Sequence, residues 1–244
     1  MSSPFLLPVL FGLGAAVTVA RMDLPEDFAA DAVRVGFTGF GGRNNGSYAI
    51  TDPSGASWSG EFSRTESRLG VFDPLVVRQK GKGSFQFADP GTGEHLLDAE
   101  CAFKKLTINV DVVTVDKKKA AYSCELTFSG KAETGRVVIG QPRREGLKKK
   151  FLAQDLRAGE AIVFGERLTL ESVHGYAGSK FSSQPAIGYL LRSGDRTLAA
   201  VELTDTNPGI YFGAGLSDNE RRAVLVAALA IAVYRDPADS ALND

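Results

Sequence analysis

The chain has few residues of the kinds that bind metal ions. Its 244 residues include two cysteines and two histidines. No C-x-x-C pair occurs, and four such residues are too few for the usual zinc-site spacings. The calcium-loop pattern D-x-[DN]-x-[DN]-G is also absent. We therefore expect no bound metal ion.

Motifs that bind nucleotides or activate a serine nucleophile are lacking as well. The glycine-rich stretch 39–46 does not have the G-x-G-x-x-G spacing, and it precedes a predicted strand instead of a helix. Residues 55–60 (GASWSG) miss the G-x-S-x-G pattern because serine stands where the second glycine belongs. We expect no cofactor, and no motif assigns an enzyme class.

Neither sign of charge is in excess, since the formal net charge is −1. No global field attracts nucleic acid, so we expect no nucleic-acid partner, and an anion-binding site would need a local patch. Hydrophobic residues make up 43% and charged residues 23% of the chain. This balance is typical of a globular protein and excludes wholesale disorder.

Glycine, by contrast, is abundant, with 27 residues. Glycine supplies the positive φ angles of tight turns, so its excess predicts many short strands joined by turns. Alternating apolar and polar residues begin near residue 33 and are interrupted by turn compositions such as GGRNNG and TDPSGAS. The pattern predicts about a dozen strands in a single domain.

The clearest alternation lies on both sides of the charged segment 116–119 (DKKK). Apolar residues occupy every second position over 106–112 and again over 122–128. This predicts an antiparallel hairpin that pairs Cys124 with Asp111. Cys101 would then lie about ten strand residues, or ~33 Å, from Cys124, whereas a disulfide needs Cα atoms within ~6 Å. We expect the two cysteines to be unlinked.

A helix is predicted over residues 218–235. Ser217 and Glu220 fit a capping box, and residues 223–234 (AVLVAALAIAVY) are apolar on every face. A helix that is apolar all round must be buried all round. The apolar part would be about 18 Å long at ~1.5 Å per residue, too short to span a bilayer. A sheet must therefore wrap around this helix.

Residues 2–20 form an uncharged segment at the N-terminus. As a helix it would be roughly 28 Å long, close to the ~30 Å hydrocarbon core of a bilayer. Three interpretations remain open: an uncleaved membrane anchor, a signal peptide cut after Ala20, or a segment packed on the domain. For an anchor, Arg21 and Arg34 lie downstream and put the domain in the cytoplasm. Our leading prediction is membrane association through residues 2–20 with a cytoplasmic domain, and export after cleavage is the alternative.

The order of these features resembles the tubby C-terminal-like superfamily, which includes the LURP-one-related proteins and the phospholipid scramblases. The match is best over AVELTDTNPGIYFGAGLSDNERRAVLVAALAIAVYRD, which runs from a late strand into the apolar final helix. The resemblance implies a mainly β fold, a closed antiparallel barrel of roughly twelve strands around a buried C-terminal hydrophobic helix. We expect a hydrophobic segment at 1–22, a linker at 23–33, the barrel at 34–236 with its helix at 218–235, and a tail at 237–244.

Five basic residues form the densest positive cluster in the chain: Arg143, Arg144, Lys148, Lys149 and Lys150. One interpretation of this basic patch is a solvated charged loop. The other is a surface for anionic lipid, where each basic residue contributes ~1 kcal/mol. Tubby proteins bind phosphoinositide head groups through basic residues, but their site cannot be aligned here residue by residue.

Three functions remain open at this stage. The leading prediction is a non-enzymatic barrel module at a membrane surface that contacts anionic lipid head groups through the basic patch. The first alternative is an enzyme of unknown class with His95 or His174 as general base. The second is a structural or protein-binding module. A concave site that holds a histidine with carboxylate or hydroxyl neighbours would favour the enzyme.

Overall fold

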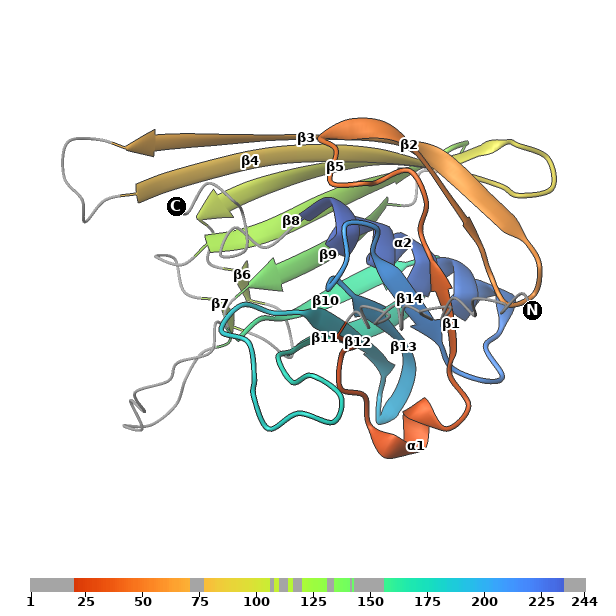
Figure 1. Cartoon of the computed structure of the whole chain (residues 1–244). Helices are drawn as coiled ribbons and strands as arrows, with labels where there is room; N and C mark the ends of the chain where they lie inside the picture. Colours follow the sequence, from red (N-terminus) through yellow and green to blue (C-terminus); the bar gives the residue numbers. More distant parts are fainter. Residues whose placement is uncertain are drawn as a thin grey trace, which may run out of the picture.

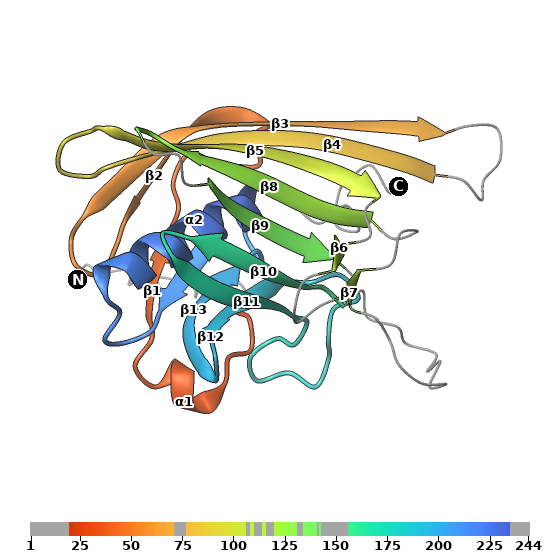
Figure 2. The same cartoon turned by 180° about the vertical axis from the view of Figure 1, so that it is seen from behind.

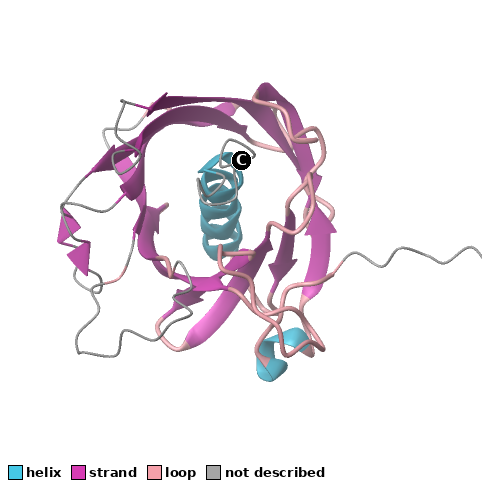
Figure 3. Ribbon diagram, turned by 60° about the vertical axis from the view of Figure 1, so that its left-hand side comes forward, coloured by secondary structure: helices cyan, strands magenta, loops and turns pink. Residues whose placement is uncertain are grey.

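The computed structural model describes residues 20–70, 77–105, 108–109, 114–115, 120–130, 134–140, 142 and 156–234. Twelve antiparallel strands form a nearly closed barrel, and the C-terminal helix packs inside it against the strands (Figures 1 and 3). The elements are α1 (Glu26–Ala29), β1 (Val33–Gly36), β2 (Asn45–Thr51), β3 (Ser57–Gly70), β4 (Val77–Ala88), β5 (His95–Lys105), β6 (Ile108–Asn109), β7 (Thr114–Val115), β8 (Ala120–Phe128), β9 (Thr134–Gly140), β10 (Ala158–Val163), β11 (Glu166–Val173), β12 (Gly188–Ser193), β13 (Arg196–Glu202), β14 (Gly209–Phe212) and α2 (Asp218–Tyr234).

The barrel sheet has the order β1-β14-β13-β12-β11-β10-β9-β8-β5-β4-β3-β2, so β1 and β2 are its two edges. These edges meet just beyond β1. The amide of Thr38 donates to the carbonyl of Ala49 at 2.8 Å, and the amide of Ala49 donates back at 3.1 Å. Closure therefore rests on one bridging residue pair, while β3 continues beyond the end of β2 from Arg64 to Gly70. Figure 2 shows the same wall of strands from behind.

Side-chain alternation decides which face of each strand looks inward. In β2, Tyr48 and Ile50 are buried, while Ser47, Ala49 and Thr51 are exposed. This is the expected pattern for a sheet that is wet on one face. In β13, by contrast, all five residues from Leu198 to Glu202 are buried. Its outer face is covered too, by residues that follow the N-terminal apolar segment.

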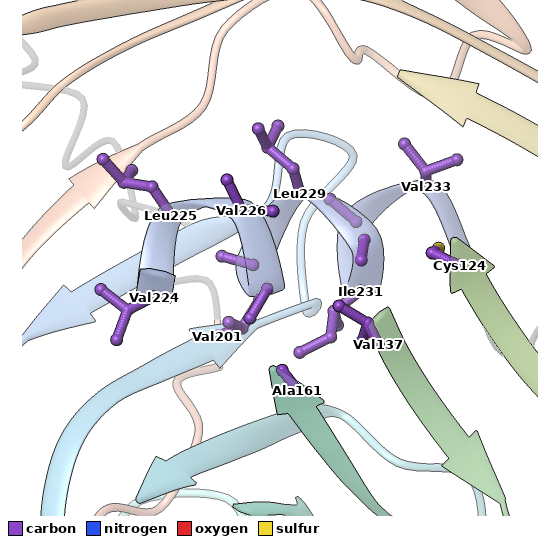
Figure 4. Close-up of a cluster of buried hydrophobic side chains, with 14 of the residues drawn as sticks. Cys124, Val137, Ala161, Val201, Val224, Leu225, Val226, Leu229, Ile231 and Val233 are labelled. Carbon is purple, nitrogen blue, oxygen red and sulfur yellow. The ribbon is translucent and has the colours of Figure 1, made fainter. Parts of the chain in front are cut away.

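The prediction of a central helix is confirmed. The amide of Glu220 donates to Ser217 Oγ at 3.2 Å, and the amide of Ser217 donates to the Glu220 carboxylate at 2.8 Å, so the capping box forms as predicted. Every residue from 223 to 234 is buried. Figure 4 shows Leu225, Leu229 and Val233 on one side of the helix and Val224 on another, among side chains of the barrel wall.

The predicted hairpin and the predicted free thiols are wrong. Strand β8 pairs with β5, with Lys105 opposite Ala120 and Cys101 opposite Cys124. The two cysteines form a disulfide with an S–S distance of 2.02 Å. Residues 108–109 and 114–115 instead pair as β6 and β7, a separate two-stranded sheet. The alternation in 106–112 predicted strand structure, which the chain has at 108–109. It carries no information about which strand lies opposite, so the predicted pairing with 122–128 is wrong.

The N-terminal predictions fall on residues 1–19, which lie outside the described residues, as do the tail at 237–244 and the turn at 116–119. Within the part of the chain that the structure describes, no helix combines the length and the apolar character needed to cross a membrane.

Candidate functional site

His95 lies at the exposed start of β5. Its Nε2 is 2.8 Å from Oδ2 of Asp98, and about half of each side chain is exposed. An imidazole–carboxylate pair can orient a general base, but this pair stands on the open outer wall of the barrel. The structure does not bring a nucleophile to it within hydrogen-bond distance among the described residues.

His174 is buried just after β11, and both of its ring nitrogens are engaged. Nδ1 lies 3.2 Å from the carbonyl oxygen of Ser183 and 3.1 Å from that of Pro185. Carbonyl oxygens only accept, so Nδ1 carries the proton, and Nε2 accepts from the Ser172 hydroxyl at 2.9 Å. The same hydroxyl accepts from the amide of Arg157. The histidine therefore ties the loop after β11 to the wall.

The predicted lipid-binding residues Arg143, Arg144, Lys148, Lys149 and Lys150 lie outside the described residues. That these residues form a surface for anionic lipid stays a prediction from the sequence.

A buried carboxylate on the outer face of β13 holds the N-terminal segment to the barrel. Glu202 is 1% exposed and accepts from the amide of Met22 at 2.9 Å, from Nη1 of Arg21 at 2.9 Å and from Nε of Arg34 at 2.8 Å. The Arg34 guanidinium also lies over the ring of Tyr211, 5.8 Å from its centroid. We call Arg21, Met22, Arg34 and Glu202 the Glu202 cluster.

The Glu202 cluster keeps its carboxylate ionised. Burial alone raises the pKa of Glu202, but the hydrogen bonds from Met22, Arg34 and Arg21 outweigh it, so the pKa lies below its ordinary value. Removing a partner from a buried carboxylate is destabilising, because it leaves part of the charge uncompensated. Residues 21–34 are thus fixed to the wall at both ends of the segment.

Glu202→Gln should lower the free energy of unfolding by about 1.5–3 kcal/mol near pH 7, because charge-assisted hydrogen bonds to a buried group are lost. The folded-state pKa is lowered, so this stability is present above the unfolded pKa of ~4.3 and is lost as the pH falls through the folded pKa. Urea unfolding of both proteins between pH 7 and pH 3 should show the difference shrinking towards acid.

A matched control for that experiment is Glu171→Gln on β11, which is separated from β13 by β12. The Glu171 side chain is 67% exposed and lies 4.0 Å from Arg192, so its replacement should change stability by less than about 0.5 kcal/mol. If Glu202→Gln changed the free energy of unfolding at pH 7 by as little as this control does, the Glu202 carboxylate would not hold residues 21–34 to the barrel.

Next to the Glu202 cluster, residues 21–23 run alongside the loop after β11. The amide of Asp23 donates to Gly175 at 2.8 Å, and the amide of Ala177 donates to Arg21 at 2.9 Å. Met22 packs into a small outer cluster with Phe28, Ile187 and Leu190. The loop also carries Phe181, which is 83% exposed. The loop that is hydrogen-bonded to residues 21 and 23 therefore carries an aromatic side chain exposed to water.

A cavity of about 230 Å³ lies where the loop between β1 and β2 meets the loop between β13 and β14. We call it the seam cavity, since these loops cover the join between the two edge strands. It is lined by Phe40, Gly42, Arg64, Ala186, Leu203, Thr204, Asp205, Thr206, Pro208 and Ala232. A broader hollow of about 510 Å³ lies over the outer faces of β3, β4, β5 and β8. Among the residues that the structure describes, neither of these two hollows is lined by a histidine.

Arg64 and Glu202 were not predicted as functional residues from the sequence. A signal for Arg64 existed, because it continues the inward positions of β3 after Trp58 and Phe62, where an apolar residue is expected. No comparable signal marked Glu202, since its partners are 168–181 residues away in the sequence.

Comparison with protein-family models, curated proteins and solved structures finds no match for this chain.

Proposed function

We propose that this chain is a non-enzymatic, tubby-like barrel module that works at a membrane surface. The observation that carries the proposal is the Glu202 cluster. It fixes Arg21 and Met22 to the barrel wall directly after the apolar segment 2–20. If that segment enters a bilayer, the barrel is held against the lipid surface with no free linker between them. Phe181, exposed on the loop that is hydrogen-bonded to residues 21 and 23, would then stand at the level of the head groups, where aromatic rings are favoured.

The described histidines support a non-catalytic role over the enzyme alternative. His174 uses both ring nitrogens to hold a loop, and His95 stands on an open wall. The barrel interior also supports a non-catalytic role, because α2 occupies the space in which many barrels bind a ligand. Binding is therefore expected at the outer wall or at the ends of the barrel.

The disulfide supports export of the domain over a cytoplasmic location. Disulfides persist in oxidising compartments and are rare in the cytosol. Arg21 and Arg34 favour a cytoplasmic domain by the positive-inside rule, but only weakly. Both guanidinium groups are paired with Glu202, and acidic residues follow at 23, 26 and 27. We therefore place the domain on the exported side of the membrane, with residues 2–20 as its uncleaved anchor, and keep export after cleavage as the alternative.

Vesicle co-sedimentation tests the proposal. The full chain should sediment with vesicles whatever their charge, because residues 2–20 insert. A chain that begins at Arg21, which keeps the Glu202 cluster intact, should bind acidic vesicles and ignore neutral ones. This binding should weaken as salt rises, because the Debye length falls below ~8 Å. Replacing Lys148, Lys149 and Lys150 by glutamate should abolish it.

Lys82→Glu is the control for charge reversal on the outer wall, since Lys82 is exposed on β4. It should leave vesicle binding of the shortened chain unchanged. Equal recovery with acidic and neutral vesicles would contradict the lipid surface. Failure of the full chain to sediment with any vesicle would contradict the membrane role of residues 2–20.

A further inference from the structure

Arg64 is a buried cation in the wall of the seam cavity. Only 7% of the residue is exposed, and it lies on the inward face of β3 opposite Gly83, which has no side chain to compete for the space. Its Nη2 donates to the carbonyl of Gly42 at 3.1 Å, and its Nε donates to Oδ1 of Asn44 at 3.3 Å. These contacts hold the guanidinium in one orientation beside the cavity. Its positive charge persists at every physiological pH.

Thr204 lines the same cavity from the loop between β13 and β14. Its Oγ1 is buried and has no hydrogen-bond partner among the described residues. A buried hydroxyl without a partner is unfavourable, so a ligand oxygen that accepts from it gains more than it would at an exposed hydroxyl. Arg64 and Thr204 line the same cavity, which therefore contains both a cation and a hydrogen-bond donor for an anionic group.

The mouth of the seam cavity has the opposite charge. Asp205 is exposed there, and Oδ1 accepts from the amide and the hydroxyl of Thr206 at 2.6 and 3.2 Å, which fixes its carboxylate. Apolar side chains of Phe40, Leu203 and Pro208 line the cavity as well. The lining therefore has a cation at its buried wall and an anion at its rim, together with apolar side chains and two threonines.

We propose that the seam cavity binds a small zwitterion whose phosphate lies at Arg64 and Thr204 and whose ammonium group lies at Asp205. Phosphoethanolamine, free or as a lipid head group, has this chemistry. The cavity volume of about 230 Å³ is below the ~300–1,000 Å³ of sites for drug-sized ligands, so only a small molecule or a head group fits. The proposal does not depend on residues 2–20 or on the basic patch.

Isothermal titration calorimetry tests this with the full chain in a maltoside detergent, which carries no zwitterionic head group. Phosphoethanolamine should bind more tightly than inorganic phosphate, and ethanolamine should not bind. Thr204→Val keeps the side-chain shape and should weaken binding of phosphoethanolamine by roughly 2- to 10-fold. Asp205→Asn should weaken phosphoethanolamine by roughly 2- to 5-fold and leave inorganic phosphate unchanged or tighter.

Arg64→Gln should weaken both anionic ligands by roughly 10- to 100-fold. Because Arg64 also holds the loop at Gly42 and Asn44, Thr204→Val and Asp205→Asn keep the test informative if the arginine variant does not fold. Competition by a short-chain phosphatidylethanolamine below its micellar concentration would assign the site to a lipid, and its absence to the free metabolite. No binding of phosphoethanolamine, or equal binding by wild type and both of these variants, would overturn the proposal.

Discussion

Leu229→Ala should lower the free energy of unfolding by about 4–5 kcal/mol, the upper part of the range for buried leucines. Leu229 is 0% exposed and lies in α2, which the barrel surrounds (Figure 3). The cost of such a truncation depends on how far the surroundings can collapse into the space that is left. A wall of hydrogen-bonded strands cannot move inward at one point without breaking its pairing, so most of the space should remain. Equilibrium unfolding in urea measures the change.

Leu156→Ala is the matched control for that prediction. Leu156 precedes β10 and is 37% exposed, so the same truncation there should cost less than about 1 kcal/mol. Equal effects at Leu229 and Leu156 would contradict a tightly packed interior around α2.

The central helix was predictable because its signals are local. Capping residues, an uninterrupted apolar run and a closing proline all lie within residues 217–237. The barrel then followed from a physical requirement, since an apolar helix of that length needs apolar neighbours on every side. Both the helix and the barrel are confirmed, with α2 ending at Tyr234, one residue before the predicted end.

Strand pairing was not predictable in the same way. Two segments before Tyr122 could have paired with 120–128: the alternating residues 106–112 and the strand that ends at Lys105. A short loop favours the nearer segment, since the entropy of loop closure rises with loop length. The structure uses the more distant one, in which Leu97, Ala99 and Cys101 are buried opposite Phe128, Leu126 and Cys124. Burial of a continuous inner face decides the pairing, and only the whole barrel determines that face.

The candidate sites depend on the same distant contacts. The Glu202 cluster joins residues 21, 22 and 34 to residue 202. The seam cavity joins a residue of β3 to three loops and to α2. The two histidines and the basic patch were candidates from the sequence because their residue types alone suggest a function. A buried arginine or glutamate stands out only when its neighbours are known.

Removing the disulfide should have the second large effect. A bridge between residues 23 apart restricts the unfolded chain, and the loop-entropy relation for a loop of this length gives about 3 kcal/mol. Replacing both cysteines by alanine should therefore lower the free energy of unfolding by about 3 kcal/mol, slightly more if the inner wall near Val233 packs less well. Both residues are buried, at 4% and 1% exposed, so the bridge should resist mild reductants until the protein unfolds.

Reductant supplies the internal control for the double alanine variant. Wild-type protein unfolded in dithiothreitol should lose the same ~3 kcal/mol, while the variant should be indifferent to the reagent. Alkylation of thiols in intact cells, before lysis, then separates the bridge from the proposed location. If both thiols are blocked only after reduction, the bridge forms in the cell and the exported location is supported. If the thiols react without reduction in cells but are linked after purification, the pairing of β5 with β8 is supported. The exported location is then contradicted. If they stay unlinked in the purified, oxidised protein as well, the pairing of Cys101 with Cys124 is itself contradicted.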